Sequence, residues 1–267
     1  MVFSAKNCRL PLDGAHMDYV RFGAGSRTLI MIPGLGDGLR TVRGTALAMA
    51  WMYRCFAKDF TVYMFSRREP MNPGTSTAAM ADDLALAMDA LDIQKADILG
   101  VSMGGMIAQQ LAIRHREKVN RLILAVTCPC PNEILTESVT EWLALADKED
   151  HADFLDSNLR RLYSQRYYRK NRWMVPILGS LTKPGSYNRF RIQAQACLTH
   201  DTRTELSQIQ APTLVIGGEA DQALGCEASR ILAAHISGAK LIIYENQGHS
   251  LYEEAPDFNQ TVLDFLK

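Results

Sequence analysis

Six short, apolar, β-branched runs alternate along the chain with longer segments in which apolar residues return every three or four positions. The runs have the composition of strands buried on both faces of a parallel sheet. The longer segments have the periodicity of amphipathic helices. Because strands that alternate with helices form an open α/β sheet with right-handed crossovers, the sequence predicts that architecture. The predicted strands are residues 28–32, 61–65, 96–101, 121–126, 213–218 and 240–245.

The alternation also predicts where functional side chains lie. Ligands of open α/β sheets bind beyond the carboxyl ends of the strands, so we expect chemistry directly after each predicted strand. The pattern is interrupted between residues 131 and 205, where helical spacing continues without a convincing strand. We interpret residues 131–205 as a helical insertion in a core formed by residues 1–130 and 206–267.

Charge and hydropathy restrict the class of partner. Lys plus Arg and Asp plus Glu both number 29, so the formal net charge is zero. A neutral chain gives no electrostatic reason to expect nucleic acid or an anionic membrane surface. No segment reaches the roughly 20 apolar residues that span a bilayer, and the first residues lack the apolar core of a signal peptide. We expect a cytosolic protein without membrane insertion, which acts on a small neutral or weakly charged molecule and does not bind nucleic acid.

The insertion has a divided charge. Residues 133–156 hold eight acids against one lysine, whereas residues 157–200 hold nine Lys or Arg and no acid. One interpretation is a solvated face, or acidic and basic helices packed side by side. The other is a basic rim that attracts an anionic substrate. Tyrosines and a tryptophan interleave with the bases, as in some nucleic-acid sites, but the neutral balance and the absence of a recognition motif argue against that class.

Residues 100–104, Gly-Val-Ser-Met-Gly, place a serine between a predicted strand and a predicted helix. This G-x-S-x-G pattern is typical of a strained strand-to-helix turn that projects the serine hydroxyl above the sheet. We expect larger residues at Gly100 or Gly104 to collide with the turn. The alternative is that Ser102 only caps the helix, although a cap needs no glycine on both sides.

A serine nucleophile needs a base to accept its proton, and the base needs an acid that orients it. Among the six histidines, His249 is the one that lies in the loop between the last predicted strand and the last predicted helix. Asp221 and Glu219 both follow the preceding strand, in a glycine-rich turn. Either carboxylate is a candidate for the acid, and both also suit a solvated turn.

The turn at residues 100–104, which we call the elbow, is followed along the chain by Asp221 and then His249. In this motif and in the order of these residues, the chain resembles the α/β-hydrolase family over nearly its whole length. The resemblance implies a mostly parallel central sheet flanked by helices, with an inserted helical cap over the serine at residues 131–205. The family's acid commonly sits in a G-x-x-D turn, which residues 218–221 match, so Asp221 is favoured over Glu219. His249, in Asn-Gln-Gly-His, matches the family's terminal histidine.

The resemblance also implies two backbone N–H donors for an oxyanion. Met103 follows the nucleophile, and Leu35 lies in a turn similar to the family's H-G-x-G, with Pro33 where histidine is frequent. The chain departs from the family a second time after the strand at 61–65. There it has Ser66-Arg67-Arg68 where many relatives have an Asp-x-Arg-Gly-x-Gly turn. That loop borders the active-site side, so this departure concerns the substrate and not the triad.

The function that the resemblance implies is hydrolysis of a small or medium carboxylic ester, lactone or thioester through an acyl-enzyme on Ser102. Neither a metal ion nor an organic cofactor is required. The same fold also supports carbon–carbon bond hydrolases, amidases or iminopeptidases, and perhydrolases. A haloalkane dehalogenase is disfavoured because that branch has aspartate at the position of Ser102. Outside enzymes, the alternative is a ligand receptor with little turnover.

Overall fold

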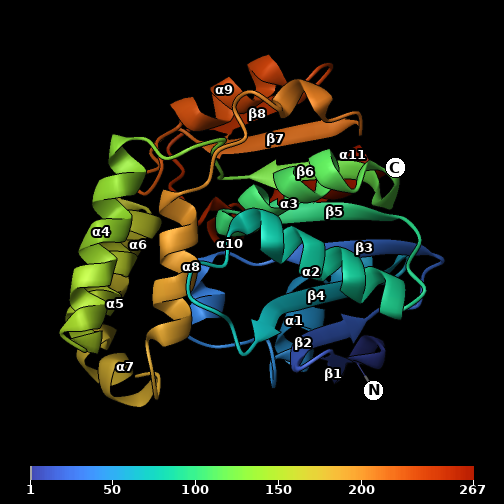
Figure 1. Cartoon of the computed structure of the whole chain (residues 1–267). Helices are drawn as coiled ribbons and strands as arrows, with labels where there is room; N and C mark the ends of the chain where they lie inside the picture. The colour runs from blue at the N-terminus through green and yellow to red at the C-terminus, as the bar shows by residue number, and fades with distance from the viewer. Residues whose placement is uncertain (1) are drawn as a thin grey trace.

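A computed structural model describes residues 2–267 and places an eight-stranded sheet through the middle of the molecule (Figure 1). The strands lie in the order β1-β2-β4-β3-β5-β6-β7-β8. β2 runs antiparallel to its neighbours β1 and β4, and the other neighbouring strands are parallel. The strand bounds are β1 Lys6–Leu12, β2 Ala15–Phe22, β3 Arg27–Ile32, β4 Phe60–Glu69, β5 Ala96–Val101, β6 Val119–Ala125, β7 Thr213–Gly218 and β8 Lys240–Tyr244.

The α-helices are α1 Ala46–Met52, α2 Thr77–Ala90, α3 Met103–Arg114, α4 Glu133–Asp147, α5 His151–Leu162, α6 Gln165–Asn171, α7 Val175–Leu181, α8 Asn188–Leu198, α9 Glu227–His235, α10 Leu251–Glu254 and α11 Phe258–Leu266. Short 3-10 turns join several of them: η1 Val2–Ser4, η2 Leu35–Gly38, η3 Arg54–Phe56, η4 Arg116–Lys118, η5 Arg172–Met174 and η6 Leu206–Gln208. Across residues 2–267, no helix combines the length and the apolarity needed to cross a bilayer.

All six predicted strands are present, as β3 to β8. Every residue of β5 and of β7 is buried, because helices cover both faces of the sheet (Figure 1). α2, α3 and α9 enclose one apolar core, and α1 and α11 enclose the other. This two-sided burial explains why these strands read as continuous apolar runs and not as alternating ones.

Side chains at the helix starts explain several element boundaries. The hydroxyl of Ser76 accepts a hydrogen bond from the Ala79 N–H at 3.1 Å and so begins α2. The side-chain oxygen of Asn132 accepts one from the Leu135 N–H at 2.8 Å and begins α4. Both are the N-cap interaction that satisfies a free backbone donor in the first turn.

Helices α4 to α8 lie between β6 and β7 in the chain and stand at the carboxyl ends of the parallel strands (Figure 1). They all fall within residues 131–205, which we call the cap segment. α8 packs closely on the turn η2, because a Cβ built on Gly38 would lie 2.7 Å from the Cα of Phe190. The exact division of the chain into core and cap at residues 131 and 205 stays a prediction.

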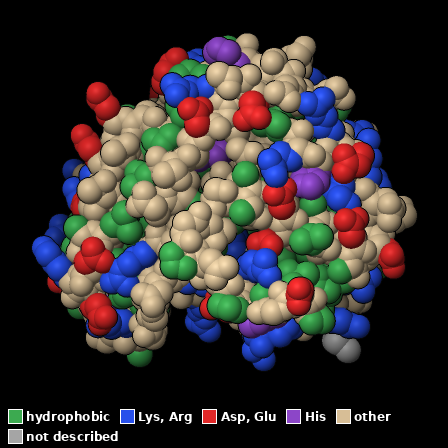
Figure 2. Space-filling view, in the orientation of Figure 1, with side chains coloured by type: hydrophobic (Ala, Val, Ile, Leu, Met, Phe, Trp, Pro, Cys, Tyr) green, Lys and Arg blue, Asp and Glu red, His purple; other side chains and the backbone are tan. Residues whose placement is uncertain are grey.

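The divided charge of the cap segment is compensated in part by ion pairs between its own helices. Arg160 and Arg161 of α5 reach Glu141 of α4 at 2.9 and 2.6 Å. Arg191 of α8 pairs with Asp147 of α4 at 2.7 Å. The interpretation of acidic and basic helices packed side by side is therefore confirmed. Figure 2 shows basic and acidic side chains interspersed over this face of the molecule, as expected for a neutral chain.

The approach of α3 to β3 explains the glycines that flank Ser102. A Cβ built on Gly104 would lie 1.9 Å from the carbonyl oxygen of Ile32 in β3. One built on Gly100 would lie 2.5 Å from the carbonyl oxygen of Gly104. Both contacts are with backbone, which cannot rotate away as a side chain can. The predicted collision at these two positions is therefore confirmed.

We expect Gly104→Ala to lower the free energy of unfolding by roughly 3 kcal/mol, because the methyl group must push α3 away from β3. Gly185→Ala is the matched control, since a Cβ at Gly185 meets no atom within 4 Å. Urea denaturation of the two variants and the parent protein measures the effect. Equal stability of the Gly104 and Gly185 variants would contradict the close approach of α3 to β3.

Candidate active site

A cavity of about 390 Å³ lies at the carboxyl ends of β3 and β5, between the sheet and the cap segment. Its volume falls within the range of small-molecule sites. The core contributes β-strand ends, the η2 turn and the beginning of α3. The cap segment contributes Leu135, Val139, Trp142, Asn158, Leu162 and Cys197. The wall is mostly apolar, so the few polar groups that face the cavity decide its chemistry.

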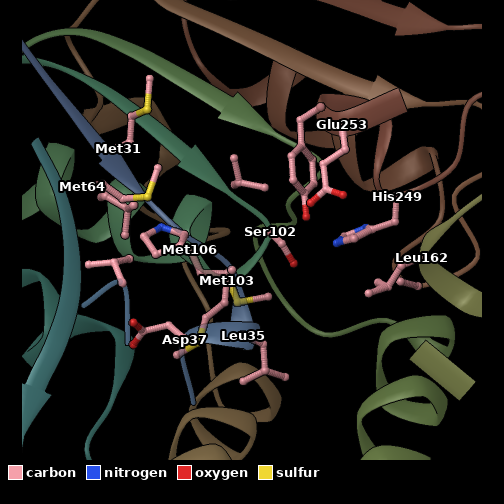
Figure 3. Close-up of a pocket in the computed structure, with 18 of the residues that line it drawn as sticks. Met31, Leu35, Asp37, Met64, Ser102, Met103, Met106, Leu162, His249 and Glu253 are labelled. Atoms are coloured by element: carbon pink, nitrogen blue, oxygen red, sulfur yellow. The ribbon is translucent and has the colours of Figure 1, made fainter. Parts of the chain in front are cut away.

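Ser102 lies in the wall of this cavity at the junction of β5 and α3 (Figure 3). Its φ of 54° and ψ of −122° are unusual for a residue with a side chain, so the backbone here is strained. Its N–H donates to the carbonyl of Ala125 at 2.9 Å, and its carbonyl accepts from the Gly105 N–H at 2.8 Å. The Ser102 side chain makes no capping bond to α3, which excludes the simple helix cap.

His249 and Asp221 are joined directly. The Nδ1 of His249 lies 2.8 Å from the Oδ2 of Asp221, and both side chains are almost fully buried. The other carboxylate oxygen of Asp221 accepts from the N–H groups of Ala223 and Leu224, at 2.8 and 3.0 Å. Because Nδ1 contacts Asp221, Nε2 is the ring nitrogen that can bond to a group in the cavity. The carboxylate therefore fixes both the orientation and the tautomer of the imidazole.

The loops that carry these two residues are bonded to each other. The Ala220 N–H donates to the carbonyl of Gln247 at 2.9 Å. A Cβ built on Gly218 would lie 2.5 Å from the carbonyl oxygen of Gly248, so the loops approach too closely for a side chain there. The carboxylate of Glu219 instead accepts from the exposed N–H of Asn246 at 3.2 Å. The structure thus brings Asp221, and not Glu219, to His249.

Ser102 and His249 line the same cavity and face one another across it (Figure 3). Within residues 2–267, no hydrogen bond joins the hydroxyl of Ser102 to the imidazole of His249. Catalytic contacts of this kind are often long before substrate binds. Three other histidines have side-chain partners: His115 contacts Asp82, His151 contacts Tyr187, and His200 contacts Thr77, while His235 contacts the backbone carbonyl of Ile231.

The two predicted oxyanion donors lie on either side of Ser102. Leu35 begins the η2 turn and Met103 begins α3, and both line the cavity. η2 approaches the serine so closely that a Cβ on Gly34 would lie 3.3 Å from the Ser102 Cβ. In the part of the chain that the structure describes, neither the Leu35 nor the Met103 N–H has an acceptor. Both donors are therefore available to an oxygen atom bound in the cavity.

A buried ion cluster supports the η2 turn from behind. Asp37, whose side chain is fully buried, accepts from the Arg189 guanidinium of α8 at 2.5 Å and from the Gln193 amide at 3.2 Å. A second nitrogen of Arg189 donates to the Asp37 carbonyl at 2.5 Å. Arg67, at the end of β4, donates to the Pro33 carbonyl at 2.5 Å, and burial lowers its pKa. The departure from the family at residues 66–68 therefore places a guanidinium behind the predicted oxyanion turn.

The basic residues of the cap segment do not line the cavity. Residues 160–172 contribute only Leu162 to its wall. Trp142 faces the cavity, whereas the exposed Tyr167 and Trp173 do not. The hypothesis of a basic rim that attracts an anionic substrate is therefore wrong, because the arginines at 160 and 161 are turned toward Glu141 of the cap itself.

Comparison with known proteins agrees with the fold. The family model of the alpha/beta hydrolase fold matches residues 27–256. The chain belongs to the α/β-hydrolase family. Solved structures agree: an enol-lactonase from Burkholderia xenovorans LB400 superposes with a TM-score of 0.81 at 24% identity, covering 97% of this chain and 99% of the other. An alpha/beta hydrolase from a deep-sea metagenome library superposes with a TM-score of 0.85 at 21% identity, covering 97% of each chain.

Relatives of this α/β-hydrolase are named as hydrolases. A putative carbamate hydrolase RutD from Caulobacter sp. (strain K31) is 27% identical over 254 residues, covering 90% of each chain. A 2-hydroxymuconate semialdehyde hydrolase from Pseudomonas sp. (strain CF600) is 30% identical over 257 residues, covering 89% of this chain and 86% of the relative. The chain is therefore an enzyme of the hydrolase class.

Sequence reasoning missed two carboxyl side chains that line the cavity of this α/β-hydrolase, Asp37 and Glu253. Asp37 lies two residues after Leu35, and Glu253 lies four residues after His249 in the short helix α10. His249 lies in the turn before α10, so helical spacing does not mark Glu253, and its nearness to His249 in the sequence is the signal that remains.

Two buried cysteines of the hydrolase, Cys197 and Cys128, have thiols with raised pKa values. Burial raises the pKa of the Cys197 thiol to about 12, so this residue is a neutral part of the cavity wall. Burial also raises the pKa of Cys128. Over residues 2–267, no group of three His, Cys, Asp or Glu side chains is arranged to hold a metal ion.

We expect Arg189→Met to lower the free energy of unfolding of this hydrolase by about 3 kcal/mol, because it leaves the buried Asp37 with only part of its compensation. Arg191→Met is the matched control on the same helix. Its partner Asp147 is largely exposed, and such a pair contributes less than about 1 kcal/mol. Urea denaturation compares the two variants. An equal loss of stability in both would contradict the role of Arg189 in holding η2.

Proposed function

We propose that this chain is a serine hydrolase that cleaves a small or medium carboxylic ester, lactone or thioester through an acyl-enzyme on Ser102. One observation carries the proposal: a strained serine and a carboxylate-bound histidine face the same apolar cavity. A serine held only for structure has no need of a positive φ, and a buried His–Asp pair is the usual partner of a serine nucleophile.

In the proposed acylation step, the Ser102 hydroxyl attacks the carbonyl carbon of the substrate and His249 Nε2 accepts the hydroxyl proton. The carbonyl oxygen becomes an oxyanion, which accepts hydrogen bonds from the N–H groups of Leu35 and Met103. Asp221 stabilises the imidazolium and keeps its orientation. When the tetrahedral intermediate collapses, the bond to the leaving group breaks and His249 returns the proton to that group.

In the deacylation step, a water molecule replaces the leaving group. His249 accepts a proton from this water, the resulting hydroxide attacks the acyl carbon, and the same N–H groups stabilise the second oxyanion. Collapse of this intermediate releases the carboxylic acid and restores the Ser102 hydroxyl. Every proton in the cycle passes through His249, and no other group is needed.

The cavity wall favours an ester over more polar substrates. Apolar side chains from β-strands, α3 and the cap segment form most of its surface, and a modest acyl group buries its methylene groups against them. A lactone or a thioester of similar size offers the same carbonyl to Ser102. The relatives named as hydrolases of a carbamate and of 2-hydroxymuconate semialdehyde favour amide-type or carbon–carbon hydrolysis as the second candidate.

We expect Ser102→Ala to lower turnover of a p-nitrophenyl ester by about 10⁴- to 10⁶-fold, as removal of a triad member does in other serine hydrolases. A fluorophosphonate probe is expected to label the parent protein at Ser102 and to leave this variant unlabelled. Mass spectrometry locates the label, and esters of increasing chain length define the acyl group. An alanine variant that keeps most of its activity would overturn the assignment. Labelling without turnover of any ester, amide or lactone would favour a receptor.

We expect Asp221→Asn to lower kcat by about 10⁴-fold, because the amide no longer fixes the imidazole tautomer or stabilises its charge. Glu219→Gln is the matched control, since its carboxylate is exposed and contacts only the N–H of Asn246. Steady-state kinetics with one ester compares the two. If the control lost as much activity as Asp221→Asn, Asp221 would not be the acid.

A further inference from the structure

Glu253 is the carboxylate of the cavity wall that has no cationic partner. The acidic and basic side chains that line the cavity besides His249 are Asp37, Arg40 and Glu253. Asp37 is compensated by Arg189. Arg40 lies two residues after η2 and, like Glu253, is exposed. Within residues 2–267, no Lys, Arg or His nitrogen lies within 4.0 Å of the Glu253 carboxylate. The negative charge of Glu253 is therefore available to a ligand.

The carboxylate of Glu253 is held in place and keeps one oxygen free. The phenol of Tyr163, at the end of α5, donates to its Oε2 at 2.6 Å. The Tyr163 ring is itself stacked on Tyr167, with ring centroids 4.3 Å apart. Across the described chain, no donor bonds to Oε1. Figure 3 shows Glu253 directed toward the space between Ser102 and His249.

The surroundings of Glu253 suit a positive group. Two tyrosines, Tyr53 and Tyr252, line the cavity with it, and both phenol pKa values are raised by burial and by the charge of Glu253. Partial desolvation raises the pKa of Glu253 and the Tyr163 hydrogen bond opposes that rise, while the residue as a whole stays exposed to solvent. Aromatic faces next to a carboxylate are a combination that attracts alkylammonium groups. A carboxylate so placed repels a ligand that carries a carboxylate of its own.

We propose that Glu253 selects substrates whose ester carries a positively charged ammonium group, and that it excludes substrates carrying a carboxylate near the reacting bond. This inference rests on the proposed serine-hydrolase function, and it names the substrate class of that site. Glu253 contacts the substrate without taking part in bond making or breaking. Oε1 accepts the ammonium charge, while Tyr163 keeps Oε2 fixed from the cap side.

The test uses pairs of esters that differ only in charge. One pair places the charge on the alcohol: butyrylcholine and its carbon isostere 3,3-dimethylbutyl butyrate. The other places it on the acyl group: the p-nitrophenyl ester of 4-trimethylammoniobutyrate and its tert-butyl isostere. We expect the parent protein to favour the cation by at least about tenfold in kcat/KM in one pair. Glu253→Gln and Glu253→Leu are expected to bring that ratio close to one.

Glu254→Gln is the matched control for the loss of one negative charge on the same helix. The Glu254 carboxylate accepts from the N–H and the hydroxyl of Ser164, at 2.9 and 2.6 Å, and does not line the cavity. We expect this variant to keep the preference of the parent protein for the cation. The same loss of preference in Glu254→Gln would show that a general charge effect operates and would overturn the proposal. A ratio near one for both pairs in the parent protein would overturn it as well.

A binding measurement separates this inference from the proposed reaction. Calorimetry compares choline with 3,3-dimethylbutanol on the Ser102→Ala protein, with and without Glu253→Gln. Tighter binding of choline that depends on Glu253 supports the inference even if no ester is turned over, a result that would count against the hydrolase mechanism alone. Equal binding of the two alcohols, together with normal ester turnover, would overturn the role of Glu253 and leave the serine mechanism intact.

Discussion

The contact between Gly104 and the carbonyl of Ile32 is the constraint on which the site depends. It lets α3 begin directly beside β3, so the chain that leaves β5 must turn back within one residue, and Ser102 takes up that turn with its positive φ. The same closeness brings the η2 turn over the serine, at Gly34. Ser102 and the η2 turn that carries Leu35 therefore lie next to each other at this contact between strand and helix.

The fold and the positions of Ser102 and His249 could be predicted because both follow from chain direction, whereas the choice of Asp221 over Glu219 came from the resemblance to the α/β-hydrolase family. Strands buried on both faces are recognisable runs, and their carboxyl ends meet at one edge of the sheet, which collects Ser102, Asp221 and His249. The other residues around the cavity could not be predicted in this way. Which of their side chains face the cavity depends on how the cap helices and α10 are rotated about their own axes. Arg189 and Arg191 look alike in the sequence, yet the side chain of Arg189 is 12% exposed and that of Arg191 is 33% exposed. Glu253 and Glu254 likewise differ only in which side of α10 they occupy.

The cap segment contacts the core on both sides of the cavity, at the η2 turn and at the loop that carries His249. Its helix α8 fixes the η2 turn through Arg189 and the packing of Phe190 on Gly38. At the end of α5, the carbonyl of Leu162 accepts from the Ser250 N–H at 2.7 Å, next to His249. The predicted oxyanion turn and the histidine loop are therefore each bonded to a different cap helix.

The proposed reaction creates a negative charge on one side of the cavity and a positive charge on the other. The fixed charges of the protein are arranged with the opposite sign on each side. Arg67 and Arg189 donate to the carbonyls of Pro33 and Asp37, which flank Leu35, so two guanidinium groups lie behind the place where an oxyanion would form. On the opposite side, the histidine that must become a cation is bonded to the carboxylate of Asp221, and Glu253 lines the cavity with it. Fixed charges of this kind stabilise a transition state because they need no reorganisation during the reaction. A cationic substrate group beside Glu253 would compensate the carboxylate of the cavity wall for which the described residues 2–267 provide no cationic partner.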